Sequence, residues 1–273
     1  MRHQGRPGPT ARTRVVEHRD AGTRRRDDRV VAEEPLEIRL AAPGMPARRV
    51  WVTMRTPGHD FELAAGFAVH ESLARPSSIR RVDYCTDADL TADQAFNVVT
   101  LTLDEPTDVP GRHGALSGGA SACGVCGKDS VEEVLAVRPA APWTGDRPGP
   151  DVVRRLPARL GEAQSIFART GGVHAAGLFT ADGDLLVARE DVGRHNAVDK
   201  VTGARVLAGE PPAGACLVVS GRAGFELVQK AVSVGTGALV AVGAPTHLAV
   251  DLAREAGMTL FGFTAEDRCV EYA

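Results

Sequence analysis

The sequence predicts an α/β protein with two unequal parts, and three observations support this. The second half alternates short apolar runs with amphipathic segments, as strands and helices alternate in an α/β domain. The first half has several strand patterns and one helix pattern. A proline-rich stretch separates the two halves. We therefore expect a smaller N-terminal α+β domain over residues 30–138, a connector over 139–150 and an α/β domain over 151–273.

Composition and charge are those of an ordinary globular protein. Of the 273 residues, 43% are hydrophobic and 25% are charged, which allows a sizeable core. The net charge of −3 gives no electrostatic reason to expect nonspecific nucleic-acid binding. No apolar run approaches the ~20 residues of a membrane-spanning helix. Five cysteines without the spacing of a disulfide framework, and no secretory signal, predict a cytoplasmic location.

The N-terminal part begins with a segment unlike the rest. Residues 1–29 are rich in arginine and have almost no large apolar side chain, so we expect a disordered tail. Its arginines suggest a nucleic-acid arm, but four acidic residues dilute the charge: Glu17, Asp20, Asp27 and Asp28. Order is expected from Val30 onward. Apolar periodicity then predicts strands over 35–40, 49–54, 79–84 and 95–103, and one helix over 61–72.

The second half has the alternating rhythm of a parallel sheet. Short apolar runs predict buried strands, and Gly209 and Gly257 are placed as helix stops. Thr246 is placed as a helix cap. The expected strands cover 173–179, 185–189, 215–219, 239–242 and 259–263. The expected helices cover 130–137, 160–169, a segment from Asn196 to Leu207, 225–234 and 246–256.

A glycine-rich stretch from Leu116 to Lys128 carries Cys123 and Cys126, with two residues between them. Glycine this dense predicts a mobile loop, where reactive groups are often placed. The pair suits half of a zinc site, a dithiol–disulfide couple or a thiolate that carries sulfur. The remaining cysteines are scattered and form no second pair, which disfavours zinc: Cys85, Cys216 and Cys269. Lys128 is either a cation that lowers a thiol pKa or an ordinary surface charge.

A second motif, Ser220–Gly224, lies between a buried strand and a helix start. Gly221 lets a ligand approach the backbone, Arg222 can fork onto phosphate oxygens, and a helix N-terminus favours anions. These features indicate an anion or nucleotide-phosphate site. The motif matches neither a P-loop nor a dinucleotide fingerprint, and a plain turn that needs glycine explains it equally well.

Two further segments are candidates for ligand contact. The run Glu190–Asn196 packs two acids with Arg194 and His195, and it indicates either ligand contact or a helix start that Asp191 caps. His174, in an apolar strand, is either a core histidine with satisfied hydrogen bonds or, as we expect from the adjacent Gly171 and Gly172, part of the same site. After the last predicted strand comes a stretch at the carboxyl edge of the sheet, where α/β folds bind ligands. It comprises Phe263, Thr264, Ala265, Glu266, Asp267 and Arg268.

Several of these motifs together resemble the formate dehydrogenase accessory sulfurtransferase family, FdhD. They are 123–127, 171–176, 190–200, 220–226 and 244–249, with similar segments at 33–39 and 56–58. The resemblance implies a persulfide carrier at Cys123 with Cys126 as its partner. It also implies that 263–268 binds the cofactor, Mo-bis-molybdopterin guanine dinucleotide, as a client. We hypothesise that Arg194, His195, Gly221 and Arg222 help to bind or orient it.

The same resemblance implies partners and a fold. The sulfur is expected to come from a cysteine desulfurase and to serve formate dehydrogenase, and the protein is expected to be a homodimer without an intrinsic metal. The second domain is expected to resemble the cytidine deaminase sandwich. One alternative is a non-enzymatic chaperone that only binds the cofactor. Another is a zinc deaminase, which lacks the required His-x-Glu and Pro-Cys-x-x-Cys pattern here.

Overall fold

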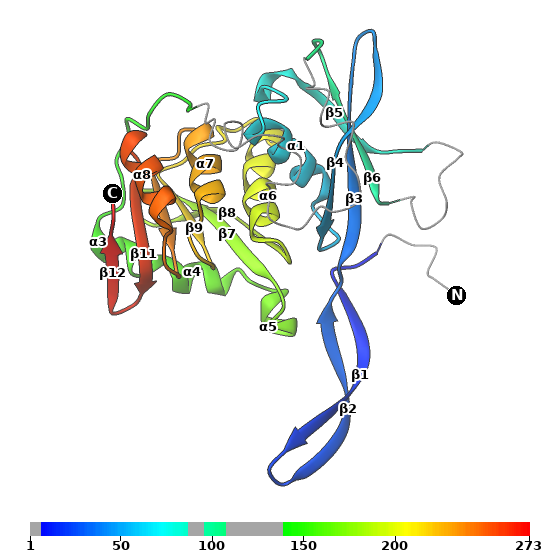
Figure 1. The fold of residues 1–273 in the computed structure, drawn as a ribbon, viewed down its shortest axis with the longest axis vertical. Helices are drawn as coiled ribbons and strands as arrows, with labels where there is room; N and C mark the ends of the chain where they lie inside the picture. Colours follow the sequence, from blue (N-terminus) through cyan, green and yellow to red (C-terminus); the bar gives the residue numbers. More distant parts are fainter. Residues whose placement is uncertain (1–6, 87–95, 108–138) are drawn as a thin grey trace.

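Two separate β-sheets and a projecting hairpin make up this mixed α/β chain, as the computed structural model in Figure 1 shows. The structure describes residues 7–86, 96–107 and 139–273. The predicted glycine-rich loop with its two cysteines, and the predicted helix over 130–137, lie outside these residues. No described helix is long and apolar enough to cross a bilayer.

The hairpin replaces most of the tail that we expected to be disordered. Strands β1 (Thr10–Arg19) and β2 (Gly22–Val31) pair antiparallel along their whole length. The expectation of disorder over 1–29 is therefore wrong from Thr10 onward. The expectation rested on composition, which does not show that opposite charges lie close together across the two strands. Arg26 and Glu17, for example, are 3.7 Å apart.

The N-terminal sheet has four strands in the order β4-β3-β6-β5. They are β3 (Glu34–Ala42), β4 (Met45–Arg55), β5 (Ile79–Tyr84) and β6 (Val98–Leu103). Alternate residues of β3 are fully buried because one face is covered by helix α1 (Asp60–His70). Trp51 stacks on Phe67 of that helix with ring centroids 4.3 Å apart. A short 3₁₀ turn, η1 (Pro76–Ser78), leads into β5.

The second sheet has six strands in the order β12-β11-β10-β9-β7-β8. They are β7 (His174–Phe179), β8 (Leu185–Asp191), β9 (Cys216–Val219), β10 (Ala238–Ala241), β11 (Thr259–Ala265) and β12 (Arg268–Glu271). Only β9, β10 and β11 pair in parallel; β7 pairs antiparallel with both β8 and β9, and β12 with β11. The expected parallel sheet is thus limited to its centre, and the sequence did not predict β12.

Helices cover both faces of this sheet. Helices α6 (Arg194–Leu207), α7 (Phe225–Ser233) and α8 (His247–Glu255) share one apolar cluster with the residues of alternate positions in the strands. The intervening strand positions pack against α3 (Pro150–Val153) and α4 (Leu156–Glu162) on the opposite face. As predicted, the Thr246 hydroxyl caps α8, accepting a hydrogen bond from the Ala249 N–H.

The helix predicted over 160–169 is wrong. The structure has α4, which ends at Glu162, and a separate turn of helix, α5 (Phe167–Thr170). The two Glu190 carboxylate oxygens accept hydrogen bonds from the N–H groups of Ile166 and Phe167, at 2.8 and 2.7 Å. This contact from a distant strand gives α5 its own N-terminus, and local periodicity cannot reveal it.

Helices α1 and α6 join the two halves through a close crossing. A Cβ atom added at Gly66 would lie 1.8 Å from the Asp199 carbonyl oxygen, and one at Gly203 would lie 1.8 Å from that of Glu62. Only glycine permits this approach. Beside the crossing, Arg189 binds Glu62 at 2.7 Å. Burial alone would raise the pKa of Glu62, but hydrogen bonds from Arg189 and His59 lower it to about 2.

We expect Gly66→Ala to destabilise the protein by about 3 kcal/mol, because the new methyl group forces two helix backbones apart. Gly161→Ala is the matched control, since a Cβ at that helical position meets nothing within 4 Å. Urea unfolding measures both variants. A Gly66→Ala variant as stable as the Gly161→Ala control would contradict this account of the crossing.

Candidate functional site

The predicted site residues of four separate motifs meet at one edge of the six-stranded sheet. Strands β8, β9, β10 and β11 all end there, and β7 begins there. Backbone hydrogen bonds tie the segments that follow these strands: the Gly243 N–H donates to the Gly221 carbonyl at 2.9 Å, and the Phe263 N–H donates to the Gly243 carbonyl at 3.1 Å. The edge is thus one continuous surface.

At the centre of this edge, Ser220–Gly224 leads from β9 into α7. The Ser220 hydroxyl accepts a hydrogen bond from the Ala175 N–H at 2.9 Å, which fixes the turn. Arg222 is exposed and has no ion pair among the residues that the structure describes. Helix α7 follows its N-cap residue, Gly224, without a side-chain cap. Free N–H groups beside an unpaired guanidinium form an arrangement that suits an anion.

The turn after β10, Val242–Thr246, belongs to the same surface, although our sequence analysis missed it. A Cβ at Gly243 would lie 3.0 Å from the Arg222 side chain, so glycine lets the arginine lie across this turn. The Ala223 N–H donates to the Ala244 carbonyl at 3.1 Å. The signal was available, because Gly243 follows a buried strand just as Gly221 does.

Arg194 and His195 begin α6 beside this turn, but in different surroundings. Arg194 is half-exposed, and α6 also lacks a side-chain cap. His195 is only 2% exposed, and its Nε2 lies 2.8 Å from Glu226 on α7. Arg194 therefore lies at the surface of the edge, whereas His195 lies behind it and links the starts of α6 and α7.

His174 also lies at this edge, at the start of β7. Its Nδ1 is 3.4 Å from the Ser220 hydroxyl, and a Cβ at Gly221 would touch its ring at 3.5 Å. Burial lowers the pKa of His174, and the charges of Arg194 and His195 lower it further. The ring is therefore neutral at pH 7 and able to donate or accept one hydrogen bond.

The stretch after β11 presents a ring and a cation together. Phe263 has a φ of 49°, a conformation that bulky residues rarely adopt, and the residue is 39% exposed. The Arg268 guanidinium lies 5.2 Å from the centre of that ring. Thr264 is buried, and its hydroxyl has no hydrogen-bond partner among the described residues. Ala265, Glu266 and Asp267 are exposed.

Asp191 and its neighbours in the sequence have a structural role instead. Asp191 is fully buried and pairs with Lys200 at 2.6 Å. It also accepts hydrogen bonds from the Gly193 N–H at 2.8 Å, from Asn196 at 3.0 Å and from the Thr56 N–H at 3.1 Å. These contacts favour the interpretation of Glu190–Asn196 as a helix start that Asp191 stabilises. The contact with Thr56 also links this helix start to the N-terminal half.

A buried polar cluster under α1 had no sequence signal. The His70 Nδ1 lies 2.6 Å from Asp199, and Lys230 donates to the same carboxylate at 2.8 Å. Burial lowers the pKa of His70, so the ring is neutral. Burial would raise the pKa of Asp199, but Lys230 and His70 outweigh this and lower it. The cluster ties α1, α6 and α7 together, away from the edge.

The cysteines of the described part of the chain do not contribute to the edge. Burial raises the pKa of Cys216 far above that of a free thiol, which makes this thiol inert. Cys85 and Cys269 are half-buried single thiols. Within residues 7–86, 96–107 and 139–273, no group of three His, Cys, Asp or Glu side chains could hold a metal. Cys123 and Cys126 lie outside these ranges.

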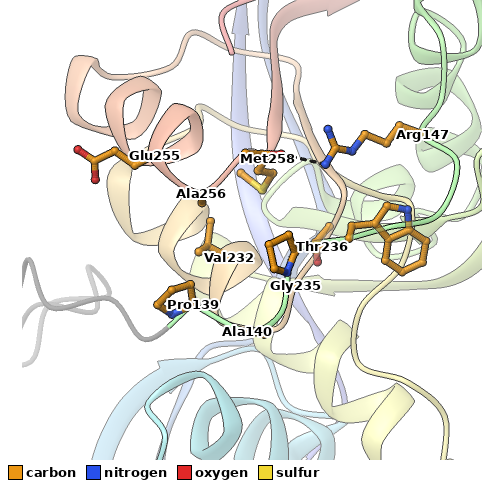
Figure 2. Close-up of a pocket in the computed structure, with 12 residues that line it drawn as sticks. Pro139, Ala140, Arg147, Val232, Gly235, Thr236, Glu255, Ala256 and Met258 are labelled. Atoms are coloured by element: carbon orange, nitrogen blue, oxygen red, sulfur yellow. Dashed lines mark hydrogen bonds between the residues drawn. The ribbon is translucent and has the colours of Figure 1, made fainter.

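A pocket of about 180 Å³ lies at the opposite end of the sheet (Figure 2). It is lined by the connector and by residues at and just after the C-terminal ends of α7 and α8. Arg147 closes one side by donating to the Gly257 carbonyl at 2.8 Å. None of the predicted site residues lines this pocket.

Comparisons with known proteins identify the family of the chain. Residues 31–273 match the model of the FdhD/NarQ family. The chain is 48% identical to the sulfur carrier protein FdhD of Nocardia farcinica, covering 93% of this chain and 89% of that protein. It is 47% identical to the protein of the same name in Streptomyces avermitilis, covering 93% and 90%.

A solved structure shares the fold. It is the crystal structure of a protein from Desulfotalea psychrophila that is described as a formate dehydrogenase accessory protein. The TM-score is 0.74 at 22% identity, and the match covers 97% of both chains. The family match over nearly the whole chain and the high identity to its members together lead to one conclusion: this chain belongs to the FdhD/NarQ family.

Proposed function

We propose that this protein is a sulfurtransferase that accepts sulfur on Cys123 and delivers it to Mo-bis-molybdopterin guanine dinucleotide on behalf of formate dehydrogenase. The observation that carries the proposal is the convergence of Arg222, Arg194 and the Phe263–Arg268 stretch at one sheet edge. The relatives' name, sulfur carrier protein, supports the sulfur chemistry.

The first step is a sulfur exchange that needs no outside oxidant. The Cys123 thiolate attacks the terminal sulfur of a persulfide on a cysteine desulfurase. A new S–S bond forms at Cys123, the S–S bond on the donor breaks, and the donor leaves as a thiolate. Because one S–S bond replaces another, the step involves no net oxidation or reduction. This step requires a reduced thiol, which fits the reducing compartment inferred from the cysteine pattern.

The second step releases the sulfur. Attack of Cys126 on the Cys123 sulfur forms a disulfide between the two cysteines and frees hydrosulfide for the cofactor. The released sulfur gains two electrons and the cysteine pair loses two, so a cellular dithiol must reduce the pair before the next cycle.

The sheet edge has the chemistry to bind the client cofactor. The guanine dinucleotide arms carry diphosphates, which suit the uncapped N-termini of α6 and α7 and the guanidinium groups of Arg222 and Arg194. The exposed Phe263 ring offers an apolar surface for a planar base, with the Arg268 cation beside it. The half-buried His174 side chain can form one hydrogen bond with the cofactor.

We expect the intact protein to gain the mass of one sulfur atom when incubated with an active cysteine desulfurase and cysteine. The added sulfur should map to Cys123, and Cys123→Ala should abolish it. Cys269→Ala is the control, because this half-buried single thiol is not part of the Cys123–Cys126 pair. Peptide mapping by mass spectrometry makes the measurement.

The same measurement separates the proposal from its alternative, a chaperone that binds the cofactor without carrying sulfur. No added sulfur on the wild-type protein, or formate dehydrogenase maturation that survives loss of both Cys123 and Cys126, would favour the chaperone.

We expect Arg222→Ala to weaken the binding of guanosine diphosphate at least tenfold, because a charge-assisted hydrogen bond contributes about 1.5–3 kcal/mol. Arg155→Ala is a matched control: Arg155 is also exposed, has no ion pair among the described residues and lies on the other side of the sheet. Titration calorimetry gives both affinities. Equal affinity for the two variants would remove Arg222 from the site.

A further inference from the structure

The connector between the two halves is bound closely to the turn between α7 and β10. The Ala140 N–H donates to the Val232 carbonyl of α7 at 3.2 Å. A Cβ at Gly235 would lie 2.6 Å from the Ala141 carbonyl oxygen, so only glycine lets the connector approach the turn this closely. A plain linker needs no such contacts, because its task is to span a distance. The contacts indicate that the connector forms part of a defined surface.

Trp143 of the connector lines the pocket, and its indole is fixed from several sides. A Cβ at Gly237 would lie 2.6 Å from the indole ring, and one at Gly145 would lie 3.0 Å from it. The indole N–H donates to the Asp146 carbonyl at 3.1 Å. A ring held in this way loses little conformational freedom when a partner binds, which favours affinity.

The other walls of the pocket combine apolar side chains with two charges. Pro139 and Met258 contribute apolar surface (Figure 2). Arg147 donates to a neutral oxygen, that of the Gly257 carbonyl. Neither Arg147 nor Glu255 has an oppositely charged partner among the residues that the structure describes. Aromatic residues, methionine and arginine are the side chains enriched at protein–protein interfaces.

The volume of the pocket favours a side chain of a partner protein over a free cofactor. The pocket of about 180 Å³ is smaller than small-molecule sites, which commonly enclose ~300–1,000 Å³. A cavity of ~150 Å³ holds a benzene molecule, so one large apolar side chain fills this pocket. Protein interfaces concentrate much of their binding energy in such anchors. Arg147 and Glu255 favour a carboxylate and a cation beside the anchor.

The position of the pocket indicates which partner it receives. It lies at the end of the sheet away from the cofactor edge, so a protein docked there leaves that edge free. Pro139, which lines the pocket, follows Cys126 by 13 residues in the sequence, and a chain of that length spans at most about 45 Å. A donor of sulfur to the cysteine pair has to bind within this reach.

We propose that the pocket beside Trp143 docks the sulfur-donor protein by receiving one large apolar side chain from the surface around its persulfide. This inference rests on the sulfur transfer proposed above and adds the place where the donor binds. Donor and client then occupy opposite ends of the six-stranded sheet, so neither has to leave before the other binds.

Two variants change the pocket in opposite directions. Trp143→Ala enlarges it, whereas Ala256→Trp fills it from the C-cap of α8. Ala208→Trp is the matched control, because Ala208 is the C-cap of α6 with a φ of −80°, against −82° at Ala256, and does not line the pocket. Biolayer interferometry on an immobilised cysteine desulfurase gives the affinities, and intact-protein mass spectrometry gives the rate of sulfur gain. Thermal unfolding and titration with guanosine diphosphate check that each variant is folded.

We expect both pocket variants to bind the desulfurase about tenfold more weakly and to gain sulfur correspondingly more slowly at low desulfurase concentration, because an anchor pocket supplies much of the binding energy. Ala208→Trp should match the wild type, and nucleotide affinity should stay the same in all three variants. Wild-type desulfurase affinity in either pocket variant would overturn the docking site and leave the sulfur transfer intact. A wild-type protein that gains no sulfur would overturn the sulfur transfer, and the docking site with it.

Two further measurements separate the donor protein from other occupants of the pocket. Free cysteine that binds the wild type in titration calorimetry but not Ala256→Trp, with unchanged desulfurase affinity, would assign the pocket to a small molecule. Faster trypsin cleavage at Lys128 in both pocket variants, again with unchanged desulfurase affinity, would assign it to a segment of this chain. Either result would overturn the proposal.

Discussion

One fully buried carboxylate, that of Asp191, joins the two halves of the chain. It lies at the end of β8, holds Lys200 of α6 at 2.6 Å and binds the Thr56 N–H of the N-terminal half at 3.1 Å. Lys200 in turn donates to the Thr56 carbonyl at 2.9 Å. Removing one partner of such a buried pair leaves an uncompensated charge, which costs about 3–5 kcal/mol. The same contacts fix the first turn of α6, and therefore the position of Arg194 at the edge.

The glycine crossing of α1 and α6 continues this junction. Gly66 and Gly203 bring the two helix backbones into contact, and the buried cluster of His70, Asp199 and Lys230 fills the space beyond them. The two halves are thus joined through backbone contact and paired charges. A junction of this kind holds the N-termini of α6 and α7 in fixed positions relative to each other, as a binding site requires.

The sequence predicted most strands and helices of the second half, because apolar runs, Gly209, Gly257 and the Thr246 cap are local signals. It also indicated Arg222, Arg194 and Phe263 as site residues, because they follow predicted strands and ligands of α/β folds bind at the carboxyl ends of parallel strands. The sequence did not show which residues of a motif are buried and which lie at the surface. His195 and Asp191 look alike as candidates, but tertiary partners on α7 and in the N-terminal half bury both. The β1–β2 hairpin was missed because composition does not show which residues of two strands lie opposite each other.

We propose that the edge formed by β8 to β11 binds the dinucleotide end of the client cofactor. Hydrogen–deuterium exchange with and without guanosine diphosphate tests it most directly. The account predicts slower exchange in residues 192–196, 220–224 and 263–268, with no change around the pocket beside Trp143. Slower exchange confined to that pocket, or no change at the edge under saturating nucleotide, would contradict it.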